Sequence, residues 1–402
     1  MTRPAILLVT AELPYPPVSG GRIKSWRMIR HVSTHYRLTV ACVLKGDDAK
    51  HLPEMQAELP GVTVLSAPVN RPRSVTNLVR SYARGEPLNV FRTHSRALAS
   101  AIANAAPEHD LLLLDHYESA QYVPEGWTRP VLLHEHNAYF TMWERFARAT
   151  PSAGHRLVAR LEARRVRRYE VAACQRADQV LAAPNDIEQL CAAGVSPAKC
   201  KETFHLGDDA PLTAPDLDLA RTDKQLLYFG LLSWEANTDG LMWFLEQVYP
   251  QIKARHPETR LRIAGKGASP RLQATVDAHP DVSLLGFVDD LEPLLATSRV
   301  FIAPLRFGAG IKVKVLTALA RGLPTVTTSI GAEGLAVASM SHLAIADTAA
   351  DFANAVSHLL EDDAACLAMA TAARALVRER YTWDRILAGL DEAIGAAMAA
   401  QA

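Results

Sequence analysis

Short apolar runs alternate with amphipathic stretches along almost the whole chain. The runs that predict buried strands cover residues 6–10, 38–44, 62–65, 111–114, 131–133, 180–183, 226–229, 261–264, 282–285, 300–303 and 325–328. Helical periodicity fills the intervals, most clearly over residues 95–106, 155–177, 238–256, 351–360 and much of 366–398. Continuous apolar strands that alternate with helices indicate parallel sheets covered on both faces. The pattern therefore predicts a doubly wound α/β protein.

The alternation breaks once, near the middle of the chain. Residues 207–222 contain Asp-Asp-Ala-Pro and Ala-Pro-Asp, which are typical of an irregular connection. A chain of 402 residues is expected to form about two domains. We therefore predict an N-terminal domain over residues 1–207, a linker over 208–222 and a C-terminal domain over 223–381. Because ligands of such sheets bind at the carboxyl ends of strands, we expect one cleft between the two domains.

The charge balance excludes one broad class of function. Lys plus Arg and Asp plus Glu both number 43, so the formal charge is zero, whereas a general nucleic-acid-binding protein is expected to be basic. The five cysteines are scattered without CxxC spacing, which indicates reduced thiols in the cytoplasm. No apolar run is long enough for a signal peptide or a membrane span. We expect a cytoplasmic protein that is able to dock on a membrane surface.

Polar and glycine clusters follow the predicted strands. Asp115-His116 and His134-Glu135-His136-Asn137 end two strands of the first half, and Asn185 or Asp186 is expected to cap the helix after another. In the second half, the run Gly308-Ala-Gly-Ile-Lys-Val-Lys314 joins a strand to a helix. Backbone amides and ammonium groups at a helix N-terminus favour anions, so this loop predicts a phosphate site. An ordinary turn with solvated lysines fits the same pattern and stays open.

With these motifs in order, the chain resembles the family-4 retaining glycosyltransferases of GT-B architecture, in the branch with a Gly-Ala-Gly-Ile-Lys-Val-Lys donor loop. The C-terminal segments that carry the resemblance are Tyr228-Phe-Gly230 with Asn237, Leu261–Gly267, Leu285–Asp290, Ala303–Lys314, Gly322-Leu-Pro324 and Gly331–Gly334. The N-terminal segments are Pro14–Gly21 and His136-Asn137, and Tyr381-Thr-Trp383 resembles the segment before the last helix. The C-terminal motifs are the more specific.

The resemblance implies two tandem Rossmann-like domains, with a C-terminal helix at about 382–402 that packs back onto the first. It also implies transfer of a sugar, with retention of configuration, from a nucleotide-diphosphate sugar of UDP or GDP type to a hydroxyl-bearing acceptor. That acceptor would be a glycan, a lipid-linked glycan or a small metabolite. Neither a cofactor nor a catalytic metal is expected.

The resemblance also implies roles for single residues. Its catalytic candidates are His136, Arg306 and Lys312. His136 matches the family's histidine that faces the donor sugar, and fixed cations such as Arg306 and Lys312 stabilise a departing diphosphate. Its donor-binding candidates are Gly20, Gly21, Gly230, Asn237, Gly265, Lys266, Phe287, Val288, Gly308, Gly310, Ile311, Lys314 and Thr317. Its acceptor-side candidates are Tyr15, His116, His134 and Tyr139. His136 also fits a core or capping histidine, and His134 is its alternate at the same strand end. Lysines two positions apart diverge on a helix, so Lys312 and Lys314 meet one phosphate only if the loop is not yet helical there.

Two departures from the family's pattern leave alternatives open. Ala309 and Thr317 stand where the family usually carries glutamates, and Thr317 is expected to reach a ribose only through water. A non-catalytic nucleotide-sugar-binding or partner subunit is therefore an alternative. An epimerase of the same fold is another, although it would be expected to carry a carboxylate pair.

The helix over residues 155–177 is rich in arginine between Arg156 and Arg168. One interpretation is a solvated face with i,i+4 ion pairs that include Glu162. The other is docking on an anionic membrane that carries a lipid-linked acceptor. The oligomeric state has no signature in the sequence.

Overall fold

The computed structural model describes residues 3–150, 152–204, 209–219, 222, 224–308 and 310–400, with only the backbone of Ala149. The chain forms two compact units, Met1–His205 with Asp384–Ala402, and Leu206–Trp383. They are called the N-terminal unit and the C-terminal unit below, and each is described by itself. Gly207, the last residue of the predicted N-terminal domain, and Ala309 lie outside the described residues.

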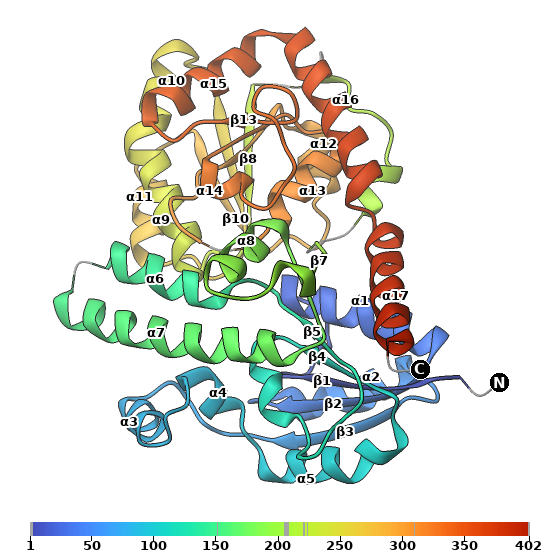
Figure 1. The fold of residues 1–402 in the computed structure, drawn as a ribbon. Helices are drawn as coiled ribbons and strands as arrows, with labels where there is room; N and C mark the ends of the chain where they lie inside the picture. The colour runs from blue at the N-terminus through green and yellow to red at the C-terminus, as the bar shows by residue number, and fades with distance from the viewer. Residues whose placement is uncertain are drawn as a thin grey trace. The chain divides into compact units, whose positions relative to one another are not determined.

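The N-terminal unit is built on a seven-stranded parallel sheet in the order β3-β2-β1-β4-β5-β6-β7 (Figure 1). Its strands are β1 (Ala5–Thr10), β2 (Arg37–Leu44), β3 (Thr63–Pro68), β4 (Leu111–Asp115), β5 (Val131–His134), β6 (Gln179–Ala182) and β7 (Cys200–Glu202). The order reverses between β1 and β4, which is the doubly wound arrangement in which ligands bind beside that reversal.

Helices cover both faces of this sheet. The helices of this unit up to residue 192 are α1 (Gly20–His35), α2 (Leu52–Glu58), α3 (Val75–Ala83), α4 (Leu88–Thr93), α5 (Arg96–Ala105), α6 (Tyr139–Ala149), α7 (Ala153–Arg176) and α8 (Pro184–Ala192). Leu7 and Val9 of β1 pack in one core cluster, and Ile6 and Leu8 pack in another. This alternation is the consequence of side chains that point to opposite faces of a strand. Helix α17 (Trp383–Ala399) contributes Leu390, Ala393, Ile394 and Ala397 to the second cluster.

The C-terminal unit contains a six-stranded parallel sheet in the order β10-β9-β8-β11-β12-β13. Its strands are β8 (Gln225–Phe229), β9 (Arg260–Ala264), β10 (Val282–Gly286), β11 (Val300–Ala303), β12 (Thr325–Thr327) and β13 (Ala344–Ile345). Its helices are α9 (Glu235–Trp243), α10 (Tyr249–Arg255), α11 (Pro270–Asp277), α12 (Glu292–Thr297), α13 (Val313–Arg321), α14 (Ser329–Ala332), α15 (Ala349–Glu361) and α16 (Asp363–Arg380).

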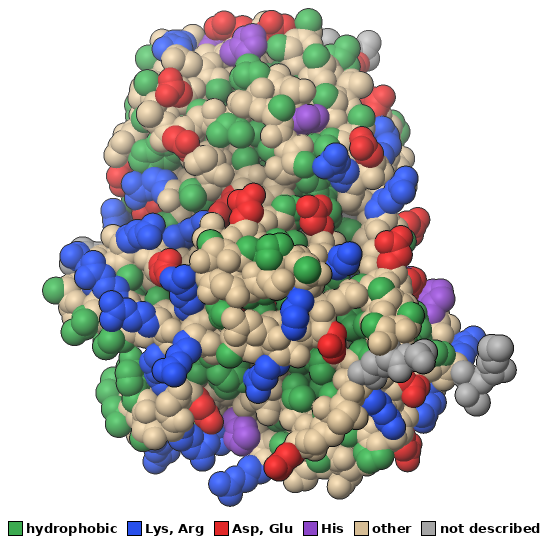
Figure 2. All heavy atoms as spheres, viewed as in Figure 1, with side chains coloured by type: hydrophobic (Ala, Val, Ile, Leu, Met, Phe, Trp, Pro, Cys, Tyr) green, Lys and Arg blue, Asp and Glu red, His purple; other side chains and the backbone are tan. Residues whose placement is uncertain are grey.

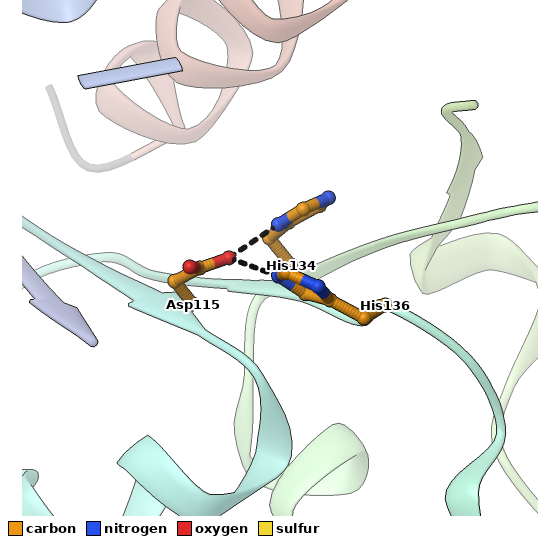
Figure 3. Close-up of side chains that lie close together, drawn as sticks. All are labelled: Asp115, His134 and His136. Atoms are coloured by element: carbon orange, nitrogen blue, oxygen red, sulfur yellow. Dashed lines mark hydrogen bonds and ion pairs between the residues drawn. The ribbon is translucent and has the colours of Figure 1, made fainter. Parts of the chain in front are cut away.

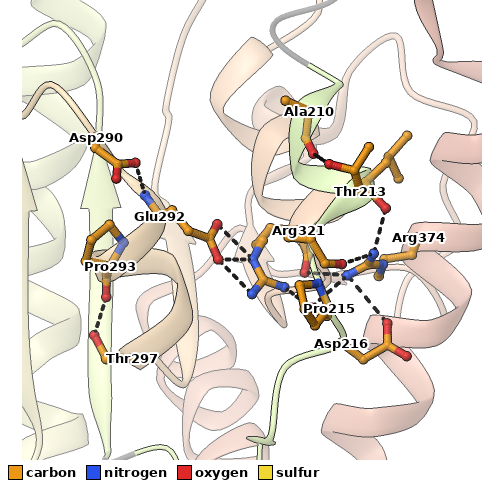
Figure 4. A network of polar contacts seen from close by, with 12 residues as sticks. Ala210, Thr213, Pro215, Asp216, Asp290, Glu292, Pro293, Thr297, Arg321 and Arg374 are labelled. Atoms are coloured by element: carbon orange, nitrogen blue, oxygen red, sulfur yellow. Dashed lines mark hydrogen bonds and ion pairs between the residues drawn. The ribbon is translucent and has the colours of Figure 1, made fainter.

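Two buried arginines fasten the beginning of the C-terminal unit to its helices (Figure 4). Nε of Arg321, on α13, lies 2.8 and 2.9 Å from the two carboxylate oxygens of Glu292, and the guanidinium also donates to the carbonyl of Pro215 at 2.7 Å. Arg374 of α16 donates to the carbonyls of Leu212 and Ala214 at 2.9 and 2.8 Å. The described part of the predicted linker is therefore held by hydrogen bonds within this unit.

The local structure corrects two predictions and adds two short strands. The helix predicted over 238–256 is interrupted by a π-helical turn, Phe244–Val248, between α9 and α10. Helix α8 begins at Pro184 after Ala183, and neither Asn185 nor Asp186 caps it. Asp186 instead accepts a hydrogen bond from the backbone amide of Ala138 at 2.9 Å. The sequence pattern did not predict β7 and β13, because strands of three and two residues carry too little periodicity.

Candidate functional site

Parallel pairing brings three strand ends together in the N-terminal unit. Thr10 at the end of β1 is in register with Asp115 at the end of β4, and Asp115 is in register with His134 at the end of β5. Helix α1 begins beyond β1, with Ser19 as its N-cap and Gly20 and Gly21 as its first residues. The polar residues that follow these strands therefore meet at the carboxyl edge of the sheet.

Asp115 is the centre of this group (Figure 3). Its Oδ1 lies 2.7 Å from Nδ1 of His134 and 2.7 Å from Nε2 of His136, and Ser25 of α1 donates to its Oδ2 at 2.5 Å. Burial alone would raise the pKa of Asp115, but His136 and the hydrogen bonds from both imidazoles hold that pKa well below its usual range. Asp115 is thus an ionised, buried carboxylate that orients two histidines.

The Asp115 contacts determine which nitrogen of each ring carries a proton. Nδ1 of His134 and Nε2 of His136 must donate to the carboxylate, so the remaining nitrogen of His136 is Nδ1. A Cβ atom built on Gly21 would lie 3.3 Å from that nitrogen, so Nδ1 faces the start of α1. Burial and then the nearby Lys24 lower the pKa of His134 to about 3. His134 is buried, so its ring has no surface open to a ligand.

His116 has an unusual backbone. Its φ is +77°, a left-handed conformation that is rare outside glycine and that clusters at functional sites. Its ring centroid lies 5.5 Å from that of His136 and 5.6 Å from that of Tyr139. Burial and then His136 lower the pKa of His116 to about 3, so the ring is neutral at physiological pH. His116, His136 and Tyr139 form an aromatic group beside Asp115. Tyr15 packs against Trp26 at 5.0 Å between ring centroids.

Lys24 was not predicted as a site residue. It lies on α1, is 3% exposed, and its Nζ has no hydrogen-bond partner among the described residues. Burial lowers its pKa to about 7, an effect that the charges of Asp115 and Asp186 oppose. A lysine on a helix is ordinarily taken to be solvated, so the sequence offered no signal for this burial.

In the C-terminal unit, glycines let two strand ends approach each other. Gly230 follows β8 and Gly265 follows β9, and a Cβ atom on Gly265 would collide with the carbonyl oxygen of Gly230. Gly265 also has a φ of +156°. A Cβ atom on Gly230 would lie 3.1 Å from the Tyr228 hydroxyl and 3.4 Å from Nζ of Lys314. A side chain at Gly230 would fill the space in front of the lysine.

Lys314 lies in the first turn of α13 and is held by two polar partners. Its Nζ donates to the Tyr228 hydroxyl at 2.8 Å and to Oδ1 of Asn237. Asn237 in turn donates to the carbonyl of Leu231 at 2.7 Å. Burial, and secondarily Lys312, lower the pKa of Lys314 to about 7. This ammonium group is therefore preorganised and short of negative partners.

Lys312 is the N-cap residue of α13 and has non-helical dihedrals, with φ −89° and ψ 94°. The loop is thus not yet helical at Lys312, which is the condition under which both lysines are able to serve one ligand. The side chain is 4% exposed, and its Nζ donates to the carbonyl of Gly310 and lies 3.9 Å from Oε2 of Glu333. A Cβ atom on Gly308 would lie 3.3 Å from Cε of Lys312, so this glycine allows the lysine to fold over the loop.

The other C-terminal candidates have different surroundings. Arg306 is paired with Asp239, at 2.8 Å from Nε and 2.5 Å from Nη2. The Thr317 hydroxyl donates to the carbonyl of Val313 at 3.0 Å, within its own helix. Phe287 is 66% exposed, and Nζ of Lys266 lies 5.7 Å from its ring centroid. Ile311 is buried and Val288 is half-buried.

Asp115, His134 and His136 also meet the geometric requirement for a metal site. One potential ligand atom from each residue lies within 4.8 Å of the others. Two imidazoles and a carboxylate suit zinc or a related transition ion. The buried Lys24 beside Asp115 opposes a divalent cation whenever it is protonated.

Comparisons with known sequences match part of the chain. The family model described as "Glycosyl transferases group 1" matches residues 223–362, which include the Gly308–Lys314 loop. A Klebsiella pneumoniae protein described as "Uncharacterized 44.6 kDa protein in cps region" is 27% identical over 173 residues, which are 41% of this chain and 44% of that protein. The match thus spans less than half the length of this relative.

Solved structures match nearly the whole chain. HepE from Anabaena, in complex with UDP and glucose, has a TM-score of 0.65 at 17% identity and covers 97% of this chain and 99% of its own. Sucrose-phosphate synthase from Thermosynechococcus elongatus has a TM-score of 0.69 at 16% identity, and the match covers 99% of this chain and 100% of the synthase chain. These likenesses confirm the predicted fold class, the GT-B fold of two Rossmann-like domains. Within it, the C-terminal unit carries the sequence pattern of group 1 glycosyl transferases.

Proposed function

We propose that the protein is a retaining glycosyltransferase of the family-4 type, which acts in the cytoplasm without a catalytic metal. It would move a sugar, which we take to be a hexose, from a UDP- or GDP-type donor to a hydroxyl group of an acceptor. That acceptor would be a glycan, a lipid-linked glycan or a small metabolite. The observation that carries the proposal is the Gly308–Lys314 loop, where two buried ammonium groups meet the N-terminus of α13. The family model that covers this loop supports it.

The C-terminal unit would bind the donor. Lys314, Lys312 and the amides at the start of α13 would contact the diphosphate, whose negative charge grows as the bond to the sugar breaks. Donors that are already in place stabilise this charge without reorganisation. Lys266 and the exposed ring of Phe287 would border the nucleoside. HepE, which shares the fold, has been crystallised with UDP and glucose, which supports a nucleotide sugar as donor.

The N-terminal unit would bind the acceptor. His136, which Asp115 orients, would form a hydrogen bond with a sugar hydroxyl, and His116, Tyr139 and Tyr15 would line the acceptor side. Asp115 is a positioning residue in this scheme, because it acts on a substrate through His136.

The proposal is tested by thermal shifts with UDP, GDP and their sugar conjugates. A ligand at 100 times its Kd stabilises a protein by about 2.7 kcal/mol, so a specific donor raises the melting temperature visibly. Wild type should respond to one nucleotide series, and Lys314→Met should lose most of that response. No shift with any diphosphate would refute the donor site. The anomeric configuration of the product, read by nuclear magnetic resonance, then tests retention.

A non-catalytic nucleotide-sugar-binding or partner subunit is the second candidate. One observation favours it, since Thr317 uses its hydroxyl within α13 where the family carries a glutamate. Such a protein would show the thermal shift and no turnover with any acceptor. Release of nucleotide diphosphate in the presence of an acceptor extract would exclude it.

A further inference from the structure

Helix α3 exposes an apolar face. Val75 is 78% exposed, Val79 is 62% exposed and Tyr82 is 39% exposed. These positions follow an i, i+4, i+7 spacing, so they lie on one side of the helix. An exposed row of this size is unusual unless another surface covers it.

Helix α7 adds a second group of exposed apolar residues beside the first. Leu157 is 60% exposed, and Val158 and Leu161 are each 38% exposed. Arg165 joins the two helices, because it donates to the carbonyl of Ser81 at 2.8 Å and its guanidinium carbon lies 3.8 Å from the ring centroid of Tyr82. We call the set Val75, Val79, Tyr82, Leu157, Val158 and Leu161 the apolar face.

Positive charge surrounds the apolar face. Residues 71–84 contain four arginines and no acidic residue, and residues 139–176 contain nine arginines and three glutamates, in a chain of zero net charge. Glu162 and Glu170 are buried, and they accept hydrogen bonds from the backbone amides of Leu88 and Tyr139. Figure 2 shows blue arginine and lysine side chains in a group near the green hydrophobic surface of this part of the molecule. The charge on this face is thus almost entirely positive.

A shallow pocket on α7 continues the basic surface. Arg164, Arg167, Arg168 and Gln175 line it together with Val171 and Ala193. Arginine binds phosphate oxygens through paired N–H groups, so this pocket suits phosphate headgroups. Across the described residues, no helix is both long enough and apolar enough to cross a bilayer.

We propose that the apolar face and its arginines dock the N-terminal unit on an anionic lipid bilayer. Side chains of α3 and α7 would enter the interface while the arginines bind headgroup phosphates. A second copy of the chain fits less well, because a symmetric contact would bring arginines against arginines. A nucleic acid would match the arginines and leave Val75, Val79 and Leu157 uncovered. This proposal does not depend on glycosyl transfer.

The test is co-sedimentation of the full chain with vesicles. We expect binding to vesicles of phosphatidylcholine and phosphatidylglycerol, weaker binding at high salt, and little binding to phosphatidylcholine alone. Because each arginine near such a surface contributes about fivefold in affinity, the triple variant Arg160→Glu, Arg164→Glu, Arg168→Glu should bind at least about 100-fold more weakly. The control variant Arg30→Glu, Arg271→Glu, Arg378→Glu makes the same charge change at exposed positions elsewhere.

A single apolar substitution separates a bilayer from other polyanions. Leu157→Ser should weaken vesicle binding roughly tenfold, whereas Leu367→Ser, at a leucine of similar exposure (58% against 60%), should not. Vesicle binding that Leu157→Ser leaves unchanged would overturn the proposal in favour of a general polyanion surface. A dimer that Leu157→Ser dissociates in sedimentation equilibrium, without vesicle binding by wild type, would overturn it in favour of self-association. Circular dichroism and thermal unfolding show that each variant is folded.

Discussion

Asp115 accepts hydrogen bonds from Ser25, His134 and His136 at the end of β4. None of these partners is its neighbour in the chain, and the side chain is buried. A carboxylate in this position fixes the orientation of the imidazole rings of His134 and His136. Its replacement should therefore affect the proposed sugar transfer more than nucleotide binding.

Asp115→Asn tests this role. The asparagine amide is uncharged and its nitrogen cannot accept from Ser25, so the two imidazoles lose their charged acceptor and His136 is held less firmly. We expect the transfer rate to fall about 10- to 100-fold, which corresponds to the ~1.5–3 kcal/mol of a hydrogen bond to a charged group, with the Kd for nucleotide diphosphate unchanged. Asp178→Asn is the control, because Asp178 accepts from the Val131 amide at 2.8 Å next to the start of β6. Equal losses in the two variants would contradict a positioning role.

Gly265 gives a prediction about stability. In Gly265→Ala the new Cβ atom meets the carbonyl oxygen of Gly230, and the φ of +156° is unfavourable for alanine. The expected loss is ~2–4 kcal/mol in the free energy of unfolding, measured by denaturant titration. Gly154→Ala, where the Cβ atom meets nothing within 4 Å, should change stability by less than about 0.5 kcal/mol. A Gly265→Ala protein as stable as wild type would show that the two strand ends move apart at little cost.

At the scale of elements, two helices that begin at the carboxyl ends of the sheets carry buried lysines. Lys24 lies on α1 and Lys314 lies on α13, and burial lowers the pKa of each to about 7. In both cases the helix packs its lysine against the end of a parallel sheet. The two lysines differ in their surroundings, because Lys314 has neutral hydrogen-bond partners and belongs to the predicted donor loop, whereas Nζ of Lys24 has no hydrogen-bond partner among the described residues.

The affinity for a nucleotide sugar should depend on pH through Lys314. UDP-glucose does not titrate near neutrality, and it would bind the protonated lysine. Affinity should therefore be highest below pH 7 and fall up to about tenfold per unit as pH rises above the pKa of about 7. Isothermal titration should show proton uptake on binding. Lys314→Met should bind weakly with no such dependence, whereas Lys224→Met, at an exposed ion pair with Glu258, should keep it. The range from pH 6 to 9 spans the lowered pKa of Lys314. A wild-type affinity that is constant over this range would contradict a contact between Lys314 and the nucleotide sugar.

Stability should depend on pH through Lys24. Its folded pKa of about 7 lies below the ordinary value of 10.5, so between these values the unfolded chain binds more protons than the folded one. The free energy of unfolding then rises with pH in this window, by up to ~1.4 kcal/mol per unit for one lysine. Lys24→Met should flatten the slope by that amount and stabilise the protein at pH 7. Lys50→Met, at an exposed lysine, should leave the slope as it is in wild type.

At the scale of the whole molecule, one fold carries two strand-edge sites of different chemistry. The C-terminal unit presents buried ammonium groups and helix amides, and the N-terminal unit presents an ionised carboxylate with oriented histidines. This division fits a reaction in which one unit stabilises a leaving diphosphate and the other positions an acceptor.

Removal of metal ions tests whether the N-terminal group acts as a hydrogen-bond network. After chelation and dialysis, turnover of donor with acceptor should be unchanged, because the proposed stabilisation uses lysines and amides. Added zinc should not raise the rate. Loss of turnover on chelation with recovery on one metal would instead make Asp115, His134 and His136 a metal centre.

The sequence alone determined the fold class and the positions of the longer strands. A buried parallel strand is a continuous apolar run, and the loops at strand ends are recognised by their glycines. Both features are local properties of the sequence. The predicted strands over 6–10, 38–44, 111–114, 261–264 and 300–303 coincide with β1, β2, β4, β9 and β11. The Gly308–Lys314 loop likewise predicts an anion site from its sequence, and this site stays a prediction.

Only the tertiary structure decided which side chains are partners. Asp115 meets His134 and His136 because β4 pairs with β5, and Lys314 meets Tyr228 and Asn237 because α13 begins beside β8 and α9. Arg306, which the sequence suggested for the diphosphate, is bound to Asp239 across 67 residues. The physical reason is that strand order and helix packing join segments distant in sequence, while burial of a charge such as Lys24 depends on everything packed around it.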